Sequence, residues 1–319
     1  MRVTLLGGGT GCARLAVPLA AAIGAPRLTV IVNTGDDLWR HGLRICPDLD
    51  TNLYALAGMR DRERGWGVAG DTFRTMDQLR RLGEDAWFAL GDLDLATHLL
   101  RSAGLRAGAS LSAVTADLAR RAGVTARLLP ATDDEVATRV LTSQGELSFQ
   151  EYFVRERAEV DVLGVHIAGI ERARPAPGVV ESIMSADLVV IGPSNPVASL
   201  GPILGLPGVR TALETRRNDR LPSAIVTPVV DAVPISAEGE ARRARCRASM
   251  MRAHGADHRA SGVGAMLSGL AETFVVDRAD VSEIAALERL GYRVVVADTL
   301  IGDHGDGQEL VGSLLTAAR

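Results

Sequence analysis

The chain of 319 residues contains no lysine, so all 35 of its basic residues are arginine. This absence excludes reactions that need an amine side chain, such as Schiff-base formation with pyridoxal phosphate or a carbonyl substrate. It also excludes a P-loop of the G-x-x-x-x-G-K-[ST] type, whose lysine reaches the nucleotide phosphates. The positive charge at a phosphate site must therefore come from arginine or a metal ion, and backbone N–H groups can add hydrogen bonds.

Cysteine is also scarce. The three cysteines, Cys12, Cys46 and Cys246, are odd in number and have no C-x-x-C spacing. This pattern argues against a disulfide framework and against a structural zinc site, and we expect a cytoplasmic protein. No apolar run reaches the length of a membrane span and no signal-peptide pattern opens the sequence, so we expect no membrane partner.

The charge balance is mildly acidic, with a formal net charge of −4. The arginines are scattered and form no basic stripe, which disfavours nucleic acid as a partner. Apolar residues make up 47% of the chain, enough to bury a substantial core. These values are typical of an ordinary folded enzyme or binding protein.

The pattern of apolar runs predicts an α/β protein. Strands are expected at 3–6 and 28–32, with a helix at 13–23 between them, which is a βαβ unit of a parallel sheet. The same rhythm returns later, with strands expected at 188–191, 224–226, 273–276 and 293–297 and helices at 237–253 and 281–290. We predict a Rossmann-like, three-layer fold with a mainly parallel sheet.

The middle of the chain has a different pattern, typical of amphipathic helices. Helices are expected at 72–82, 95–103 and 111–122, followed by a hairpin at 139–142 and 146–153. We therefore predict a nucleotide-binding core formed by 1–50 and 160–319, with a mainly helical insertion at 51–159.

A glycine-rich turn follows the first predicted strand and includes Gly8, Gly9, Thr10 and Gly11. Such a turn at the start of a helix brings backbone N–H groups together and is typical of phosphate sites; a tight turn without a ligand is the alternative. The G-x-G-x-x-G fingerprint is broken, and Asn33 replaces the acidic residue expected after the second strand. These departures disfavour a nicotinamide oxidoreductase.

Aspartates gather in the loops that follow the predicted strands and in nearby turns. The group comprises Asp36, Asp37, Asp48, Asp50, Asp92 and Asp94. Carboxylate oxygens are the ligands that Mg²⁺ prefers, and we select Asp36 and Asp50 as metal candidates. Aspartates also cap helices and fill turns, and Asp92 is predicted to be a cap for the helix that follows it.

Four further polar side chains lie near these aspartates in the sequence. Arg44 offers a bidentate grip on a phosphate oxygen, and His41 lies between Asp37 and Asp48. His98 and Arg101 have helical spacing and share a face, although a structural histidine is an equal alternative.

Several of these segments together resemble one known family. They are Gly8–Gly11, Asn33–Asp37, His41–Thr51, Trp87–Phe88, Gly91–His98 and Ser194–Val197. In this order they are similar to the 2-phospho-L-lactate transferases of coenzyme F-420 biosynthesis. The match runs from the amino terminus to about residue 204 and thins beyond it.

The resemblance implies a reaction and its partners. A guanosine diphosphate ester would be the donor and the deazaflavin Fo the acceptor, whose terminal hydroxyl attacks phosphorus so that GMP leaves. The acid carried differs within the family and is phospholactate, phosphoenolpyruvate or phosphoglycerate. The resemblance also implies Mg²⁺, a Rossmann-like fold with a helical insertion, and a homodimer.

The resemblance also implies roles for residues. Asp50 would bind Fo and, with Asp36, hold the metal, so these two are the expected catalytic residues. The guanosine nucleotide would be held by Gly8, Gly9, Thr10, Gly11, Ser194, Asn195 and Pro196. The remaining substrate-binding candidates are Asn33, Asp37, His41, Arg44, Ala89 and His98. Ala89 stands where family members often have a lysine that contacts Fo, so the identity of acid and acceptor stays open.

A second hypothesis is a regulator that binds nucleotide sugars, from the related gluconeogenesis-factor-like group, which shares the glycine loop. The block at 41–51, together with Trp87 and His98, resembles the transferase branch instead.

Overall fold

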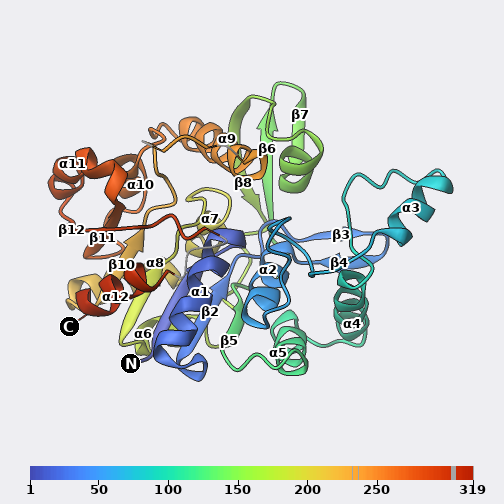
Figure 1. Cartoon of the computed structure of the whole chain (residues 1–319), viewed down its shortest axis with the longest axis horizontal. Helices are drawn as coiled ribbons and strands as arrows, with labels where there is room; N and C mark the ends of the chain where they lie inside the picture. Colours follow the sequence, from blue (N-terminus) through green and yellow to red (C-terminus); the bar gives the residue numbers. More distant parts are fainter. Residues whose placement is uncertain (232, 236, 303–306, 319) are drawn as a thin grey trace.

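The computed structural model describes residues 1–231, 233–235, 237–302 and 307–318. Its centre is a seven-stranded sheet with the strand order β12-β11-β10-β9-β1-β2-β5, in which all neighbours are parallel (Figure 1). The strands are β1 (Val3–Gly7), β2 (Leu28–Val32), β5 (Arg127–Pro130), β9 (Leu188–Ile191), β10 (Ser223–Val226), β11 (Thr273–Asp277) and β12 (Arg293–Ala297). The predicted parallel α/β architecture is confirmed.

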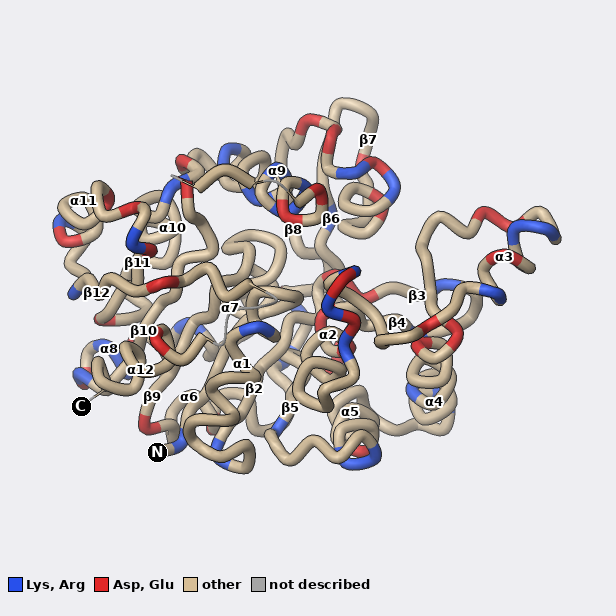
Figure 2. The backbone as a smooth tube through the Cα atoms, viewed as in Figure 1, with Lys and Arg blue, Asp and Glu red and all other residues tan. Residues whose placement is uncertain are grey.

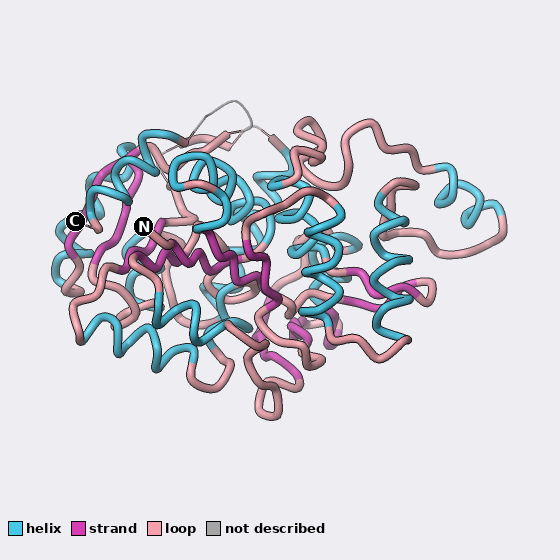
Figure 3. The backbone as a smooth tube through the Cα atoms, turned by 90° about the horizontal axis from the view of Figure 1, so that it is seen from below, coloured by secondary structure: helices cyan, strands magenta, loops and turns pink. Residues whose placement is uncertain are grey.

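The inner strands are short apolar runs because both of their faces are covered by helices. All residues of β1 and β9 are buried. One face packs on α1 (Gly9–Ile23), α2 (Pro47–Leu56), α5 (Leu111–Arg121) and α12 (Gln308–Ala317). The other packs on α6 (Val179–Ser185), α7 (Leu200–Leu204), α8 (Val209–Asn218), α10 (Ala260–Met266) and α11 (Ile284–Arg289). Seen from below, the strands form the layer between these two sets of helices (Figure 3).

Two strands differ from the predicted division of the chain. β5 lies inside the predicted insertion 51–159, yet it pairs with β2 at the edge of the main sheet. β8 (Val162–Ala168) lies in the predicted core segment 160–319, yet it pairs with β6 (Ala137–Thr142) in a separate antiparallel sheet. A short apolar run indicates a strand without indicating its partner, which is why the pattern did not assign these two correctly.

The predicted hairpin is present but its second strand is shorter than expected. β6 pairs with β7 (Gly145–Ser148), and the chain then turns into a π-helical segment, Glu151–Arg155. Ser148 ends the strand because the Glu151 carboxylate accepts hydrogen bonds from its backbone N–H and its hydroxyl, at 2.8 and 2.7 Å. A second hairpin, β3 (Leu38–Arg40) and β4 (Leu43–Ile45), was not predicted.

The expected helices in the middle of the chain are present as α3 (Arg74–Arg81), α4 (Asp94–Arg106) and α5. Of the two later ones, 237–253 is α9 (Glu238–Ala253), and 281–290 is present as the shorter α11, preceded by a kinked 3-10 segment at Arg278–Glu283. A single 3-10 turn lies at Ala25–Arg27. The first helix begins at Gly9, earlier than predicted, so the glycine-rich turn is its first turn. Within the described residues, no helix has both the length and the apolar character of a membrane span.

Aspartates cap α3 and α4 reciprocally. The Asp92 carboxylate accepts from the backbone N–H groups of Arg74 and Thr75, both at 3.0 Å, so it caps α3. The helix that follows Asp92 is instead capped by Asp71, which accepts from the N–H groups of Leu93 and Asp94 at 2.7 and 3.1 Å. Asp92 is therefore a cap, as predicted, but for a different helix.

Candidate functional site

A cavity of about 400 Å³ lies at the carboxyl ends of β1, β2 and β9. Its wall includes the glycine-rich turn, three carboxylate-bearing segments, a group of aromatic rings and the arginines of α9. This is the edge of a parallel sheet at which ligands bind.

The glycine-rich turn has no room for side chains at two positions. A Cβ at Gly8 would collide with the Asp48 carboxylate, and one at Gly11 would collide with the Pro193 carbonyl oxygen. The Ser194 hydroxyl accepts from the Gly8 N–H at 3.0 Å and donates to the Gly8 carbonyl at 3.1 Å, which joins the turn to the loop after β9. Burial raises the pKa of the adjacent Cys12 thiol, so this side chain is no nucleophile.

Asn33 organises two carboxylates at the end of β2. Its side-chain amide donates to Asp36 Oδ1 at 2.5 Å and to Asp48 Oδ2 at 3.0 Å, while its own oxygen accepts from the Gly35 N–H. Burial raises the pKa of Asp36 well above its usual range, and the Asp48 charge raises it further. Burial raises the pKa of Asp48 to about 7, against the opposing hydrogen bond from Asn33.

Asp36 and Asp48 together fit a divalent cation. Both line the cavity, and within the described part of the chain neither forms an ion pair with a cationic side chain. Two buried carboxylates that share one amide, with no cation to balance them, are costly unless a metal or protons neutralise them. Their oxygen atoms are the type of ligand that Mg²⁺ prefers.

The negative charge of Asp50 is balanced by a cationic side chain. It lies in the first turn of α2, and both of its oxygens accept from the Arg101 guanidinium of α4, Oδ2 at 3.0 Å from Nη1. Burial alone would lower the pKa of Arg101, but the Asp50 charge outweighs burial and the pKa ends above its usual range. Arg101 therefore fixes the orientation of the Asp50 side chain in the wall of the cavity.

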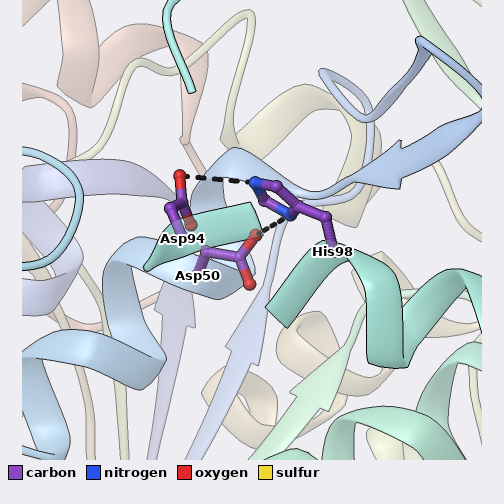
Figure 4. A group of neighbouring side chains, drawn as sticks. All are labelled: Asp50, Asp94 and His98. Carbon is purple, nitrogen blue, oxygen red and sulfur yellow. Dashed lines mark ion pairs between the residues drawn. The ribbon is translucent and has the colours of Figure 1, made fainter. Parts of the chain in front are cut away.

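The imidazole of His98 lies between two carboxylates (Figure 4). Its Nδ1 is 3.6 Å from Asp50 Oδ2, and its Nε2 is 3.3 Å from Asp94 Oδ2. The Tyr54 hydroxyl donates to Asp94 Oδ1 at 2.5 Å. Burial would raise the pKa of Asp94, but hydrogen bonds from His98 and Tyr54 and the His98 charge hold it below its usual range.

Asp50, Asp94 and His98 also form a group whose ligand atoms lie within 4.8 Å of one another. Arg101 already supplies this group with a cation, and an imidazole is a poor ligand for Mg²⁺. The pair Asp36 and Asp48 fits Mg²⁺ better because it has oxygen ligands and uncompensated charge.

Aromatic rings form another part of the wall. They are Trp66, Trp87, Phe88, Phe149 and Phe153. Phe149 and Phe153 are stacked, with ring centroids 5.5 Å apart and an interplanar angle of 7°. Ala89 lies beside them in the wall. Such a surface is suited to a flat, mostly apolar ring system.

The opposite chemistry is found on α9, which carries basic residues along its length (Figure 2). Arg242, Arg243 and Arg247 line the cavity. The cavity therefore has a carboxylate wall and an arginine wall.

The predicted site residues divide into two sets. Those that line the cavity are Gly8, Gly9, Thr10, Gly11, Asp36, Asp50, Ala89, His98, Ser194 and Asn195. Those outside its lining, as far as the described residues define it, are Asn33, Asp37, His41, Arg44 and Pro196.

The residues outside the lining have other partners. Arg44 Nη2 lies 3.4 Å from Asp37 Oδ2, so its guanidinium is engaged by a carboxylate and does not face the cavity as a phosphate ligand. Burial raises the pKa of Asp37 to about 6, against the opposing Arg44 charge. His41 lies in the turn of the β3–β4 hairpin, 3.7 Å from Glu84.

Other contributors were not selected from the sequence. Asp48 was considered, but the pattern did not indicate that it lies beside Asp36. Arg247 lies in a helix for which no site residue was predicted, and the π-helical segment that carries Phe153 was expected to be a strand. Asp48, Phe153 and Arg247 share only their place around one cavity, which a linear pattern does not reveal.

Known proteins are similar to this chain over nearly its whole length. The sequence profile of the family described as 2-phospho-L-lactate transferase CofD matches residues 3–300. The chain is 40% identical to a 2-phospho-L-lactate transferase of Methanosarcina acetivorans over 306 residues, which cover 96% of this chain and 95% of that protein. It is 45% identical to a phosphoenolpyruvate transferase of Nocardia farcinica over 242 residues, covering 73% and 72%.

A solved structure with a similar fold is that of a UPF0052 family protein from Bacillus halodurans. The TM-score is 0.63 at 16% identity, and 98% of each chain is covered. At this identity the likeness shows the fold alone.

Proposed function

Because the chain belongs to the 2-phospho-L-lactate transferase family, we propose that it transfers a phospho-acid group from a guanosine diphosphate ester to the terminal hydroxyl of the deazaflavin Fo, releasing GMP. The observation that carries the proposal is one cavity that combines a glycine-rich helix start, buried carboxylates and an aromatic wall. A diphosphate, a cation and a flat ring acceptor would each find matching chemistry there.

Asp36 and Asp48 would hold Mg²⁺, which when bound would neutralise charge on the donor diphosphate. The backbone N–H groups of Gly9 to Gly11, in the first turn of α1, would bind phosphate oxygens at the positive end of that helix. These groups are fixed before the substrate arrives, because Ser194 joins the turn to β9 and Asn33 positions both carboxylates.

Asp50 would orient the attacking hydroxyl of the acceptor. Arg101 fixes the direction of its carboxylate, which would accept the proton that leaves the hydroxyl, and His98 Nδ1 lies 3.6 Å from Asp50 Oδ2. In-line displacement at phosphorus depends mainly on positioning and charge neutralisation, so no covalent nucleophile is needed. The aromatic wall and the small Ala89 side chain would accept the deazaflavin ring.

The decisive experiment incubates the protein with Mg²⁺, Fo and each of the lactyl, enolpyruvyl and glyceryl guanosine diphosphate esters. Mass spectrometry should detect the phosphodiester product together with GMP for at least one ester. No product with any of the three would contradict the proposal. Tight binding of a UDP-sugar without binding of Fo would favour the nucleotide-sugar regulator instead.

The metal assignment has a separate test. Asp36→Asn should remove Mg²⁺-dependent turnover and the rise in melting temperature that Mg²⁺ produces, since one of the two uncompensated carboxylates is gone. Asp92→Asn is the matched control, because that carboxylate caps α3 and should leave the Mg²⁺ effect unchanged. An unchanged Mg²⁺ response in Asp36→Asn would rule out this site.

A further inference from the structure

Arg247 differs from its neighbours Arg243 and Arg245 on α9 in what holds it. Arg243 lies 2.9 Å from Glu240, and Arg245 lies 3.1 Å from Glu238, so both have a carboxylate partner. Arg247 has none within the part of the chain that the structure describes. Its Nε donates to His258 Nε2 at 3.1 Å.

The partner of Arg247 adds no negative charge. Burial and, to a smaller extent, the Arg247 charge lower the pKa of His258 to about 4. At neutral pH the imidazole is therefore uncharged and serves as a hydrogen-bond acceptor. It fixes the orientation of the guanidinium but leaves its positive charge uncompensated.

The side chain of Arg247 is half-buried and lines the cavity. Burial lowers the pKa of Arg247 to about 10, because the charged form loses part of its water. The N–H groups on Nη1 and Nη2 have no partner among the described residues. An oriented, half-buried cation with free donors is suited to an anion that can accept two hydrogen bonds.

The position of Arg247 connects it with the glycine-rich turn. The preceding residue, Cys246, has its sulfur 3.8 Å from the Asn195 side-chain amide. Asn195 follows Ser194, whose hydroxyl is bonded to Gly8. This part of α9 therefore packs directly on the loop that is joined to the glycine-rich turn.

We propose that Arg247, oriented by His258, binds the diphosphate of the donor nucleotide and faces the backbone N–H groups of the glycine-rich turn across it. The assignment rests on the proposed function for the class of donor. His258 is a positioning residue, since it lies outside the lining of the cavity and acts through Arg247.

The test measures binding of GDP and of guanosine by calorimetry, without Fo and with Mg²⁺ present. Arg247→Gln should weaken GDP binding about tenfold or more, the usual cost of losing a charge-assisted hydrogen bond, and leave guanosine binding unchanged. Arg245→Gln is the matched control, being two residues away on the same helix and paired with Glu238. It should bind GDP within about twofold of the wild type.

Two His258 variants separate positioning from mere packing. His258→Gln keeps a neutral acceptor and should retain GDP binding within about threefold, whereas His258→Glu would neutralise Arg247 and should weaken GDP binding as much as Arg247→Gln. Melting curves should show that all four variants are folded. Equal weakening by Gln and Glu at position 258 would overturn the positioning role.

The outcomes distinguish this inference from the proposed transfer. GDP binding that is unchanged in Arg247→Gln would overturn the inference. This includes the case in which only the KM of the ester rises, because the arginine would then bind the carboxylate of the acid rather than the diphosphate. Arg247-dependent GDP binding by a protein that yields no product with Fo would support the inference and contradict the transferase. No GDP binding by the wild type would overturn both.

Discussion

Two arginine side chains are shut off from solvent, Arg101 beside the cavity and Arg216 on α8. Arg101 is balanced by the Asp50 carboxylate. Arg216 donates instead to four backbone carbonyl oxygens, those of Ile183, Met184, Ala186 and Pro222, at 2.9 to 3.3 Å.

The difference separates a functional cation from a structural one. The carbonyls around Arg216 include those at the end of α6, which have no partner within the helix, so the guanidinium caps its carboxyl terminus. Burial lowers the pKa of Arg216, whereas the pKa of Arg101 ends above its usual range. The chemistry of the partner, rather than the degree of burial, indicates which arginine belongs to a site.

The largest effect is expected from Arg101→Met. It leaves the Asp50 carboxylate buried without a cation, which should lower the free energy of unfolding by about 3–5 kcal/mol and abolish transfer. Urea denaturation measures the first effect and product formation the second.

The control is the double variant Asp50→Asn, Arg101→Met, which removes both charges. It should regain most of the lost stability but no activity. A double variant as unstable as the single one would show that packing, rather than charge, is what Arg101 supplies.

A smaller effect is expected from Arg216→Met. Several buried carbonyls lose their donor, which should lower the free energy of unfolding by about 3 kcal/mol. The activity of the folded protein should be unchanged, because α8 is remote from the cavity lining. Arg210→Met, on the exposed face of the same helix, should change stability by less than about 0.5 kcal/mol. A fall in kcat for Arg216→Met at a temperature where the variant is fully folded would contradict a purely structural role of Arg216.

The smallest effect is expected from a partly exposed carboxylate that two arginines share. Glu240 lies 2.9 Å from both Arg14 and Arg243. Burial would raise the pKa of Glu240, but the two arginines outweigh it and the pKa falls to about 2. Glu240→Gln should cost less than about 1 kcal/mol at pH 7, since solvent screens the pair.

The pH dependence of that cost follows from the lowered pKa. The folded protein holds Glu240 ionised where the unfolded chain, with a pKa of about 4.3, binds a proton. The advantage of the wild type over Glu240→Gln should therefore be constant above about pH 5 and decline as the pH falls toward 2. Denaturation curves of both proteins at pH 7 and pH 3.5 test this, and a difference that grows in acid would contradict it.

The sequence was sufficient for the parallel sheet and for part of the site. Buried strands such as β1 and β9 are apolar throughout, and the glycine-rich turn directly follows one of them, so both could be recognised locally. Long helices with strong periodicity were also located within a few residues of their observed ends.

Contacts between segments that are distant in the sequence could not be predicted from local patterns. Asn33 was recognised as a departure from the dinucleotide pattern, but its role, joining Asp36 to Asp48, depends on how α2 packs beside β2. The neutral contact between Arg247 and His258 depends on the path of the chain after α9. Electrostatic balance is a property of the folded neighbourhood, and residue type alone does not determine it.

The reciprocal caps of α3 and α4 have a consequence for how this protein can vary. The Asp92 N–H donates to the Thr72 carbonyl at 2.8 Å, so residues 72–92 leave the body of the protein and return to it at one point. Trp87, Phe88 and Ala89 are carried on this excursion, whereas Asp94 and His98 lie just beyond its base. These three residues of the cavity wall thus lie on a segment whose length and composition can change while Asp94 and His98 stay in place.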